Sequence, residues 1–266
     1  MSEPVASNAV RWLGHATALI ELGGARFLTD PVLTRYVGMV VRRLAPQPPH
    51  VRELVPLDGV LISHAHYDHL DLPSVRAIRR ASGERVPPAV VLPGYADLVT
   101  KAGYTDVRTV DWYESTWLPC GARVTAIPAA HFGGRAPWRR HTGFGGFVVE
   151  HAGHTVMFAG DTGACDRYRE VGERFAIDVA LLPIGAYSPP PFRRVHMAPE
   201  DALDGMVDLD ARYLVPIHHA TFRLSAEPMG APARRLEKNA RRRGLAARVA
   251  LLRPGERFPI PPRAAS

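Results

Sequence analysis

The sequence has little cysteine and no long apolar run. Its 266 residues include two cysteines, Cys120 and Cys165, which excludes a disulfide framework and favours a reducing compartment. The apolar run Tyr36 to Val41 is far shorter than the roughly 18 to 20 residues needed to cross a bilayer. The start of the chain is polar and lacks a basic stretch followed by an apolar one, so no secretory signal is predicted. We therefore expect a cytoplasmic protein without a transmembrane segment.

Lysine is also scarce, because it occurs only at positions 101 and 238. Arginine thus supplies nearly all of the basic charge behind a formal net charge of +7, which would attract phosphates or anionic lipid. One dense cluster consists of Arg234, Arg235, Arg241, Arg242 and Arg243. No aromatic residue interleaves with these arginines, so nucleic acid is not the expected partner and the arginines are interpreted as a solvated surface.

Hydrophobic residues make up 46% of the chain, enough for a large core, and no boundary divides it, so we expect a single domain over residues 1–266. Short apolar runs predict strands, and periodic segments between them predict helices. Strands are expected over residues 10–13, 18–22, 25–29, 59–63, 89–92, 123–128, 144–150, 155–159, 178–182, 213–217 and 248–252. Helices are expected over residues 73–81, 95–102, 166–175, 199–207 and 232–243. This order favours an α/β fold with two sheets covered by helices, and an irregular surface excursion over residues 31–56.

The strongest chemical signal is the segment His64-Ala65-His66-Tyr67-Asp68-His69, which follows a short apolar run. It contains four metal-competent side chains within six residues, and histidine nitrogen and carboxylate oxygen suit zinc and similar ions. On an extended backbone, residues two apart face the same side, so His64 and His66 can share one ion. Asp68 and His69 are displaced enough to serve a second ion.

Further metal-competent residues each follow another apolar run, namely His131, Asp161 and the pair His218 and His219. Strand ends that gather along one edge of the sheets would bring these residues to the first cluster, because sites in α/β folds usually lie at the carboxyl ends of strands. Either His218 or His219 could be the metal ligand, and we favour His218 because it follows the strand directly.

These residues make the sequence resemble the metallo-β-lactamase superfamily, whose signature is His-x-His-x-Asp-His. It is most similar to the branch that contains N-acyl-phosphatidylethanolamine phospholipase D and ascorbate-6-phosphate lactonase. The matching stretches include Trp12-Leu13-Gly14-His15-Ala16-Thr17, Leu28-Thr29-Asp30-Pro31, Gly160-Asp161-Thr162-Gly163, Pro183-Ile184-Gly185-Ala186-Tyr187, His196-Met197-Ala198-Pro199-Glu200 and Ile217-His218-His219-Ala220-Thr221-Phe222.

The resemblance implies an αββα sandwich of two mixed sheets flanked by helices, with two divalent ions, zinc first and manganese or iron as alternatives. His64, His66 and His131 would hold one ion. Asp68, His69 and His218 would hold the other, and Asp161 would bridge the two ions.

It also implies roles around the ions. Asp68 would orient a metal-bridged hydroxide, and His196 would contact the substrate or donate a proton to the leaving group. Candidates for supporting or substrate contacts are His15, Asp30, Tyr187 and His219.

The expected function is hydrolysis of a phosphodiester by the metal-bridged hydroxide, on a small-molecule or lipid-like anionic substrate. A lactonase or carboxylic ester hydrolase that uses the same ion pair is the alternative. A nuclease and a non-catalytic binding protein are less favoured. A di-iron redox protein is disfavoured, because such relatives usually carry Glu where this chain has His66.

Overall fold

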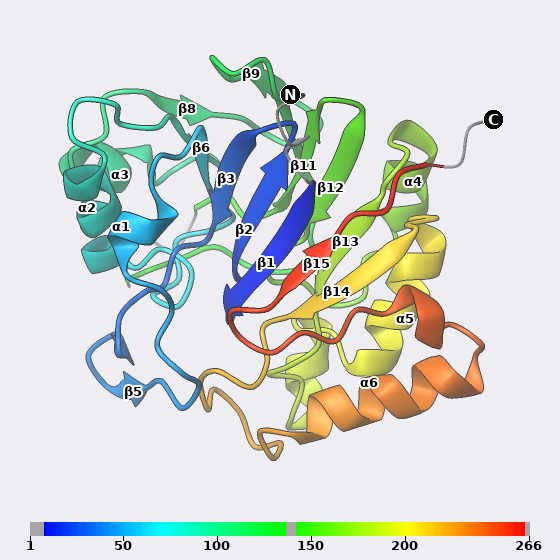
Figure 1. The fold of residues 1–266 in the computed structure, drawn as a ribbon. Helices are drawn as coiled ribbons and strands as arrows, with labels where there is room; N and C mark the ends of the chain where they lie inside the picture. The colour runs from blue at the N-terminus through cyan, green and yellow to red at the C-terminus, as the bar shows by residue number, and fades with distance from the viewer. Residues whose placement is uncertain (1–7, 137–141, 264–266) are drawn as a thin grey trace.

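The computed structural model describes residues 8–136 and 142–263, in which two β-sheets pack face to face with helices on their outer sides (Figure 1). The strand order is β15-β1-β2-β3-β6-β7-β8 in the first sheet and β14-β13-β12-β11-β10-β9 in the second. Both sheets combine parallel and antiparallel pairs: β3 is parallel to β6, for example, and β11 is antiparallel to β12. The expected αββα sandwich with two mixed sheets is therefore confirmed.

The first sheet contains β1 (Ala9–Gly14), β2 (Thr17–Leu22), β3 (Ala25–Thr29), β6 (Gly59–Ile62), β7 (Ala89–Val91), β8 (Val107–Thr109) and β15 (Arg257–Pro259). The second contains β9 (Ser115–Trp117), β10 (Arg123–Ile127), β11 (Gly146–His151), β12 (His154–Phe158), β13 (Val179–Pro183) and β14 (Tyr213–Ile217). The helices are α1 (Val51–Leu54), α2 (Leu72–Ala81), α3 (Ala96–Lys101), α4 (Tyr168–Arg174), α5 (Pro199–Asp208), α6 (Ala231–Arg242), and the 3₁₀ turns η1 (Pro190–Arg194) and η2 (Ala246–Arg248).

Strand β11 shows how the second sheet is buried on both faces. Successive side chains of a strand point to opposite faces of its sheet. Phe147 and Val149 join the core between the two sheets, whereas Val148 joins a second core beneath the helices α4, α5 and α6. Because both faces are covered, these strands are continuous apolar runs without polar alternation.

The carboxyl ends of several strands lie at a common edge of the sandwich. In the second sheet, β12, β13 and β14 are parallel, and β10 runs in the same direction because β11 is antiparallel to both β10 and β12. In the first sheet, β3 and β6 are parallel. The segments that follow these strands therefore emerge together and carry the metal-competent residues.

The end of the chain differs from the sequence expectation. No strand forms over residues 248–252: η2 ends at Arg248, and Val249 makes only an isolated bridge with Leu214. The last strand is β15, which pairs antiparallel with β1 at the edge of the first sheet. The apolar run was misleading, because Leu251 is 39% exposed instead of buried.

Residues 31–56 also contain more structure than expected. Strands β4 (Tyr36–Val37) and β5 (Val41–Arg42) form a small antiparallel hairpin, and α1 follows. The hairpin lies at the lower left of Figure 1 and projects from the body of the sandwich. No helix in the described part of the chain is long and apolar enough to cross a membrane.

Candidate metal centre

Three histidines from the two sheets form the first donor group. His64 and His66 follow β6, and His131 follows β10. Nε2 of His64 lies 2.9 Å from Nδ1 of His66, which in turn lies 3.3 Å from Nε2 of His131. Nitrogen ligands of one tetrahedral zinc ion lie about 3.3 Å apart, given Zn–N distances of about 2.0 to 2.1 Å. The three nitrogens are therefore spaced as the ligands of one ion would be.

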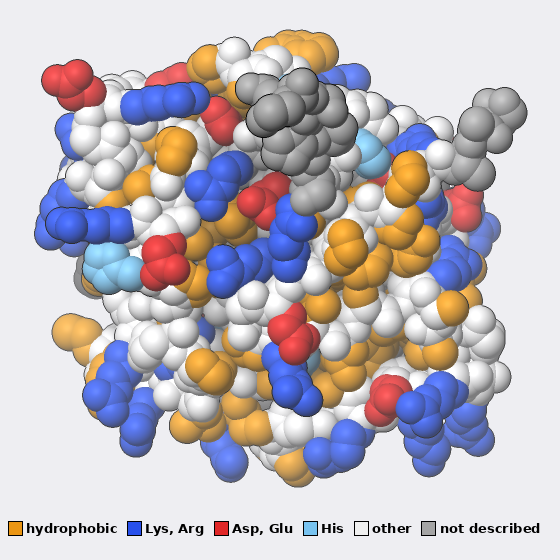
Figure 2. All heavy atoms as spheres, viewed as in Figure 1, with side chains coloured by type: hydrophobic (Ala, Val, Ile, Leu, Met, Phe, Trp, Pro, Cys, Tyr) orange, Lys and Arg blue, Asp and Glu red, His pale blue; other side chains and the backbone are white. Residues whose placement is uncertain are grey.

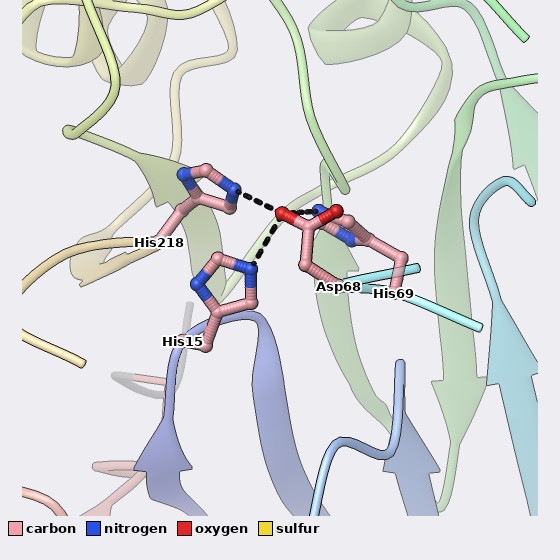
Figure 3. Close-up of side chains that lie close together, drawn as sticks. All are labelled: His15, Asp68, His69 and His218. Carbon is pink, nitrogen blue, oxygen red and sulfur yellow. Dashed lines mark hydrogen bonds and ion pairs between the residues drawn. The ribbon is translucent and has the colours of Figure 1, made fainter. Parts of the chain in front are cut away.

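The second group surrounds two carboxylates. Figure 3 shows the carboxylate of Asp68 between the rings of His15, His69 and His218. Its Oδ2 lies 3.1 Å from Nε2 of His15, and 3.7 and 3.6 Å from Nε2 of His69 and His218. Asp161, which follows β12, has its Oδ2 3.1 Å from Nε2 of both His69 and His218. Three imidazoles and two carboxylates thus converge on one small volume.

These donor atoms fit divalent cations. Nε2 of His69, Nε2 of His218 and Oδ1 of Asp161 are buried without a well-aligned hydrogen bond. A buried polar group without a partner is costly, so such atoms call for an explanation, and a cation is one that suits all three. The mixture of imidazole nitrogen and carboxylate oxygen suits zinc, manganese or iron.

Asp30 supports histidines of both donor groups from behind. Its Oδ2 lies 2.6 Å from Nδ1 of His69 and accepts a 2.5 Å hydrogen bond from the hydroxyl of Ser63. The same hydroxyl lies 2.9 Å from Nδ1 of His64. Because a carboxylate can only accept, the arrangement places a proton on Nδ1 of both rings and leaves each Nε2 lone pair facing the donor groups.

Two other rings are held from elements farther along the chain. Nδ1 of His131 donates to the carbonyl of Val195 at 3.0 Å. The backbone N–H of His15 donates to the hydroxyl of Thr221 at 2.7 Å, and the carbonyl of His15 accepts from the backbone N–H of His218 at 2.9 Å. The loop after β1 is thereby joined to the loop after β14.

The adjacent histidines His218 and His219 differ in orientation. His218 directs Nε2 toward Asp161, whereas His219 stacks on the indole of Trp12 with ring centroids 4.6 Å apart. Burial lowers the pKa of His219 to about 4, which keeps this ring neutral. Among the groups of donor atoms found in the described residues, His218 takes part and His219 does not.

The backbone is unusual where these residues sit. His15, Asp30 and His218 have positive φ angles of 54°, 29° and 56°, a region that residues other than glycine seldom adopt. Gly160, with φ at 63°, lies so close to the first sheet that an added Cβ would come within 2.6 Å of Cβ of Ser63. Such conformations cluster at functional sites, where the surrounding structure holds them in place.

The charges in the cluster shift one another's pKa. Burial opposes ionisation of Asp161, but His218 and His69 hold its pKa well below the usual value. Conversely, burial alone would lower the pKa of His218, but Asp161 raises it to about 9. Burial lowers the pKa of His15 to about 3 and that of His131 to about 4. The metal-free site is therefore a set of paired charges beside neutral imidazoles.

The remaining expected residues lie at different distances from the cluster. Nε2 of His196, in the loop before α5, is 3.4 Å from Oδ2 of Asp161, so His196 borders the donor groups. Tyr187 is half-buried, and its ring lies 5.2 Å from the guanidinium carbon of Arg235 on α6.

Sequence reasoning overlooked several supporting residues. Ser63 was included in the expected strand, although a hydroxyl next to the first histidine was a usable signal. The carbonyl of Val195 carries no side-chain signal at all. Arg135 donates to the carbonyls of Ala65 and Leu70 and so spans the histidine-rich loop, a contact made across 65 to 70 residues of sequence.

Comparison with known proteins agrees with this geometry. The family model of the beta-lactamase superfamily domain matches residues 25–219. An uncharacterized protein of Mycobacterium tuberculosis is 37% identical over 238 residues, which are 86% of this chain and 63% of that protein. An N-acyl-phosphatidylethanolamine-hydrolyzing phospholipase D of Caenorhabditis elegans is 33% identical over 82% of this chain and 64% of its own length. The chain thus spans less than two thirds of these two relatives.

A metal-dependent hydrolase of Rubrobacter xylanophilus aligns over more of its length, with 30% identity across 96% of this chain and 98% of that protein. Among solved structures, a possible metal-dependent hydrolase from Veillonella parvula superposes with a TM-score of 0.76 at 20% identity, covering 96% of this chain and all of the other. The length of the family match and the fold lead to one conclusion: this chain belongs to the metallo-β-lactamase superfamily.

Proposed function

We propose that the protein is a metal-dependent hydrolase that cleaves phosphodiesters, with two divalent ions, zinc by preference. The observation that carries this proposal is the adjacency of the two donor groups. His69 and His218 each approach Asp161 Oδ2 to 3.1 Å, and Asp161 also belongs to a donor group with His131 of the other set. Asp161 is thus the residue best placed to bridge two ions.

Two ions held there would supply an activated water and a Lewis acid for the electrophile. The chain's own residues supply the rest. Asp30 and Ser63 hold His64 and His69 in the tautomer with a free Nε2. His15 hydrogen-bonds to Oδ2 of Asp68 and thereby fixes the orientation of this carboxylate. His196 borders Asp161 and is the residue that we assign to the leaving group, to which it would donate a proton from Nε2.

The preference for phosphodiesters rests on two findings. The formal net charge of +7 favours an anionic substrate. A relative that is 33% identical over most of this chain is named as a phospholipase D, an enzyme class that cleaves phosphodiesters. The same donor set can also act on carboxylic esters, so lactones form the second arm of the test.

The test is hydrolysis of bis(4-nitrophenyl) phosphate and of a panel of lactones by zinc-loaded protein. We expect turnover of the phosphodiester, with about two metal equivalents per chain by elemental analysis. Removal of metal by a chelator should abolish turnover, and added zinc should restore it. Full activity in metal-free protein would refute the proposal. Faster turnover of lactones than of phosphodiesters would show that lactones, and not phosphodiesters, are the substrate class.

A further inference from the structure

The β4–β5 hairpin has one buried face and one exposed face. On the inner side, Val37 packs with Val32 and Phe222 in a small core of its own, separate from the two main cores. On the outer side, Tyr36 and Arg42 stand opposite each other in the strand register, and both are exposed. The hairpin is therefore held in place by this small core, and its outer face is exposed to solvent.

The turn of this hairpin holds an apolar side chain in an unfavourable backbone position. The N–H of Val40 donates to the carbonyl of Val37 at 3.1 Å, and the two central residues, Gly38 and Met39, have φ angles of 56° and 67°. Two positive φ angles define a type I′ turn, in which asparagine and glycine are favoured. A methionine there carries a conformational cost, and in the described residues its 91% exposure is the highest of any large apolar side chain. Val40 beside it is 80% exposed.

The surroundings of this tip are basic. No Asp or Glu occurs between residues 31 and 52, whereas Arg35, Arg42, Arg43 and Arg52 lie within that stretch. Arg35 and Arg42 are exposed on either side of the tip, and Arg43 is buried beneath it. Figure 2 shows hydrophobic and basic side chains gathered at the corner of the molecule where Figure 1 places the hairpin.

The hairpin borders the metal centre. A Cβ added at Gly38 would lie 3.9 Å from Cβ of Tyr67, a residue within the histidine-rich segment. Phe222, from the core beneath the hairpin, packs edge-on against His15 with ring centroids 5.3 Å apart. Any surface to which the tip of the hairpin bound would therefore lie beside the loop that carries His66 and Asp68.

From these observations we infer that the β4–β5 hairpin is an anchor for anionic phospholipid surfaces. Met39 and Val40 enter the interface of the bilayer, while Arg35 and Arg42 contact lipid phosphates. Apolar side chains flanked by arginine are the combination that peripheral membrane binding requires. A second copy of the chain is a poorer occupant, because a stable protein interface buries roughly 800 Å² on each partner, more than a two-residue tip offers.

The test is cosedimentation of the whole chain with vesicles of phosphatidylcholine that contain about 30% phosphatidylserine. We expect binding that weakens as salt is added, and little binding to pure phosphatidylcholine. Met39→Asn removes the apolar side chain but keeps the turn, since asparagine accepts positive φ, so affinity should fall by roughly 10-fold or more with no loss of thermal stability. The double variant Arg35→Gln/Arg42→Gln should reduce both the affinity and its dependence on salt.

Trp117→Asn is the matched control, because Trp117 is 65% exposed on β9, far from the hairpin in Figure 1. It should bind vesicles like the unaltered chain. Equal binding by Met39→Asn and the unaltered chain would overturn the inference. Failure of the unaltered chain to bind vesicles would also overturn it. In that case, a dimer that is seen in sedimentation velocity and that Met39→Asn dissociates would identify a second copy of the chain as the occupant. Binding is measured without turnover, so the result does not depend on the proposed function.

Discussion

Oδ2 of Asp30 lies 2.6 Å from Nδ1 of His69, on the edge of the imidazole opposite the Nε2 that faces Asp161. The same oxygen accepts the hydroxyl of Ser63, which lies against His64. One buried carboxylate therefore positions a histidine of each donor group. Outer contacts of this kind fix both the tautomer and the direction of a metal ligand.

Ser63→Ala should weaken metal binding, because the change removes the link between His64 and Asp30 and leaves Nδ1 of a buried ring without an acceptor. Loss of such a contact typically lowers metal affinity by about 10- to 100-fold. Competition with a chromophoric chelator measures this affinity. Ser63→Thr, which keeps the hydroxyl, should restore most of it. Ser82→Ala is the matched control, because this hydroxyl donates to the carbonyl of Ile78 at the end of α2. An affinity unchanged in Ser63→Ala would contradict this role.

Asp161→Asn should lower phosphodiester turnover by at least about 100-fold, because the neutral amide is a poor bridge between two cations. Circular dichroism should show an intact fold. Elemental analysis should show less bound metal per chain than in the unaltered protein. Asp166→Asn changes an exposed carboxylate five positions later and should leave turnover unaffected. Comparable turnover in the two variants would count against Asp161 as a bridge.

Gly160→Ala should destabilise the protein by about 3 kcal/mol or more. The new Cβ would lie 2.6 Å from Cβ of Ser63 and would also occupy an unfavourable positive φ. Gly153→Ala provides the comparison, because φ is 77° there but no atom lies within 4 Å of the added Cβ. Its cost should be only about 1 kcal/mol. Urea denaturation measures both, and equal costs would show that the close approach to Ser63 is unimportant.

Metal-free protein should lose stability as the pH falls from about 6.5 toward 4. In the unfolded chain histidine has a pKa of about 6.5, whereas burial lowers the pKa of His15 to about 3 and of His131 to about 4. Over this range the unfolded state binds protons that the folded state does not bind, so the free energy of unfolding decreases as the pH is lowered. His15 alone would contribute roughly 2 kcal/mol of this loss between pH 6.5 and 5.

His218, whose pKa is raised to about 9, is protonated in both states below pH 6.5, and its contribution is constant in this window. Its contribution is lost progressively as the pH rises from about 6.5 to about 9. Urea denaturation after dialysis against a chelator, at about pH 6.5 and about pH 5, checks the prediction. Equal or greater stability at pH 5 would contradict it.

The fold could be predicted from the sequence where local patterns are strong. The strands β6, β10, β12 and β14 are apolar runs with a metal-competent residue within four positions of their ends, and all four lie where expected. The strands β8 and β9 were missed, because each has three residues and their side chains are not buried. Pairing of β15 with β1 was not predictable, since it joins residues about 250 positions apart.

The donor groups could be anticipated because each member carries its own chemical signature and follows a strand. The contacts that orient them were harder to predict. The hydroxyl of Ser63, the carbonyl of Val195 and the guanidinium of Arg135 acquire their positions only from the packing of the two sheets. The choice of His218 over His219 likewise depends on Trp12, whose indole holds the second ring in a stack.

The residues that we assign as metal ligands lie between positions 64 and 218 of the chain and follow strands of both sheets of the sandwich. During synthesis on the ribosome, the last of them emerges only after β14 has been made. A nascent or prematurely terminated chain that stops before His218 can offer histidines but not the assembled pair of donor groups. Binding of ions by both proposed donor groups would consequently be a late event in biogenesis, because it requires that the two halves of the molecule have come together.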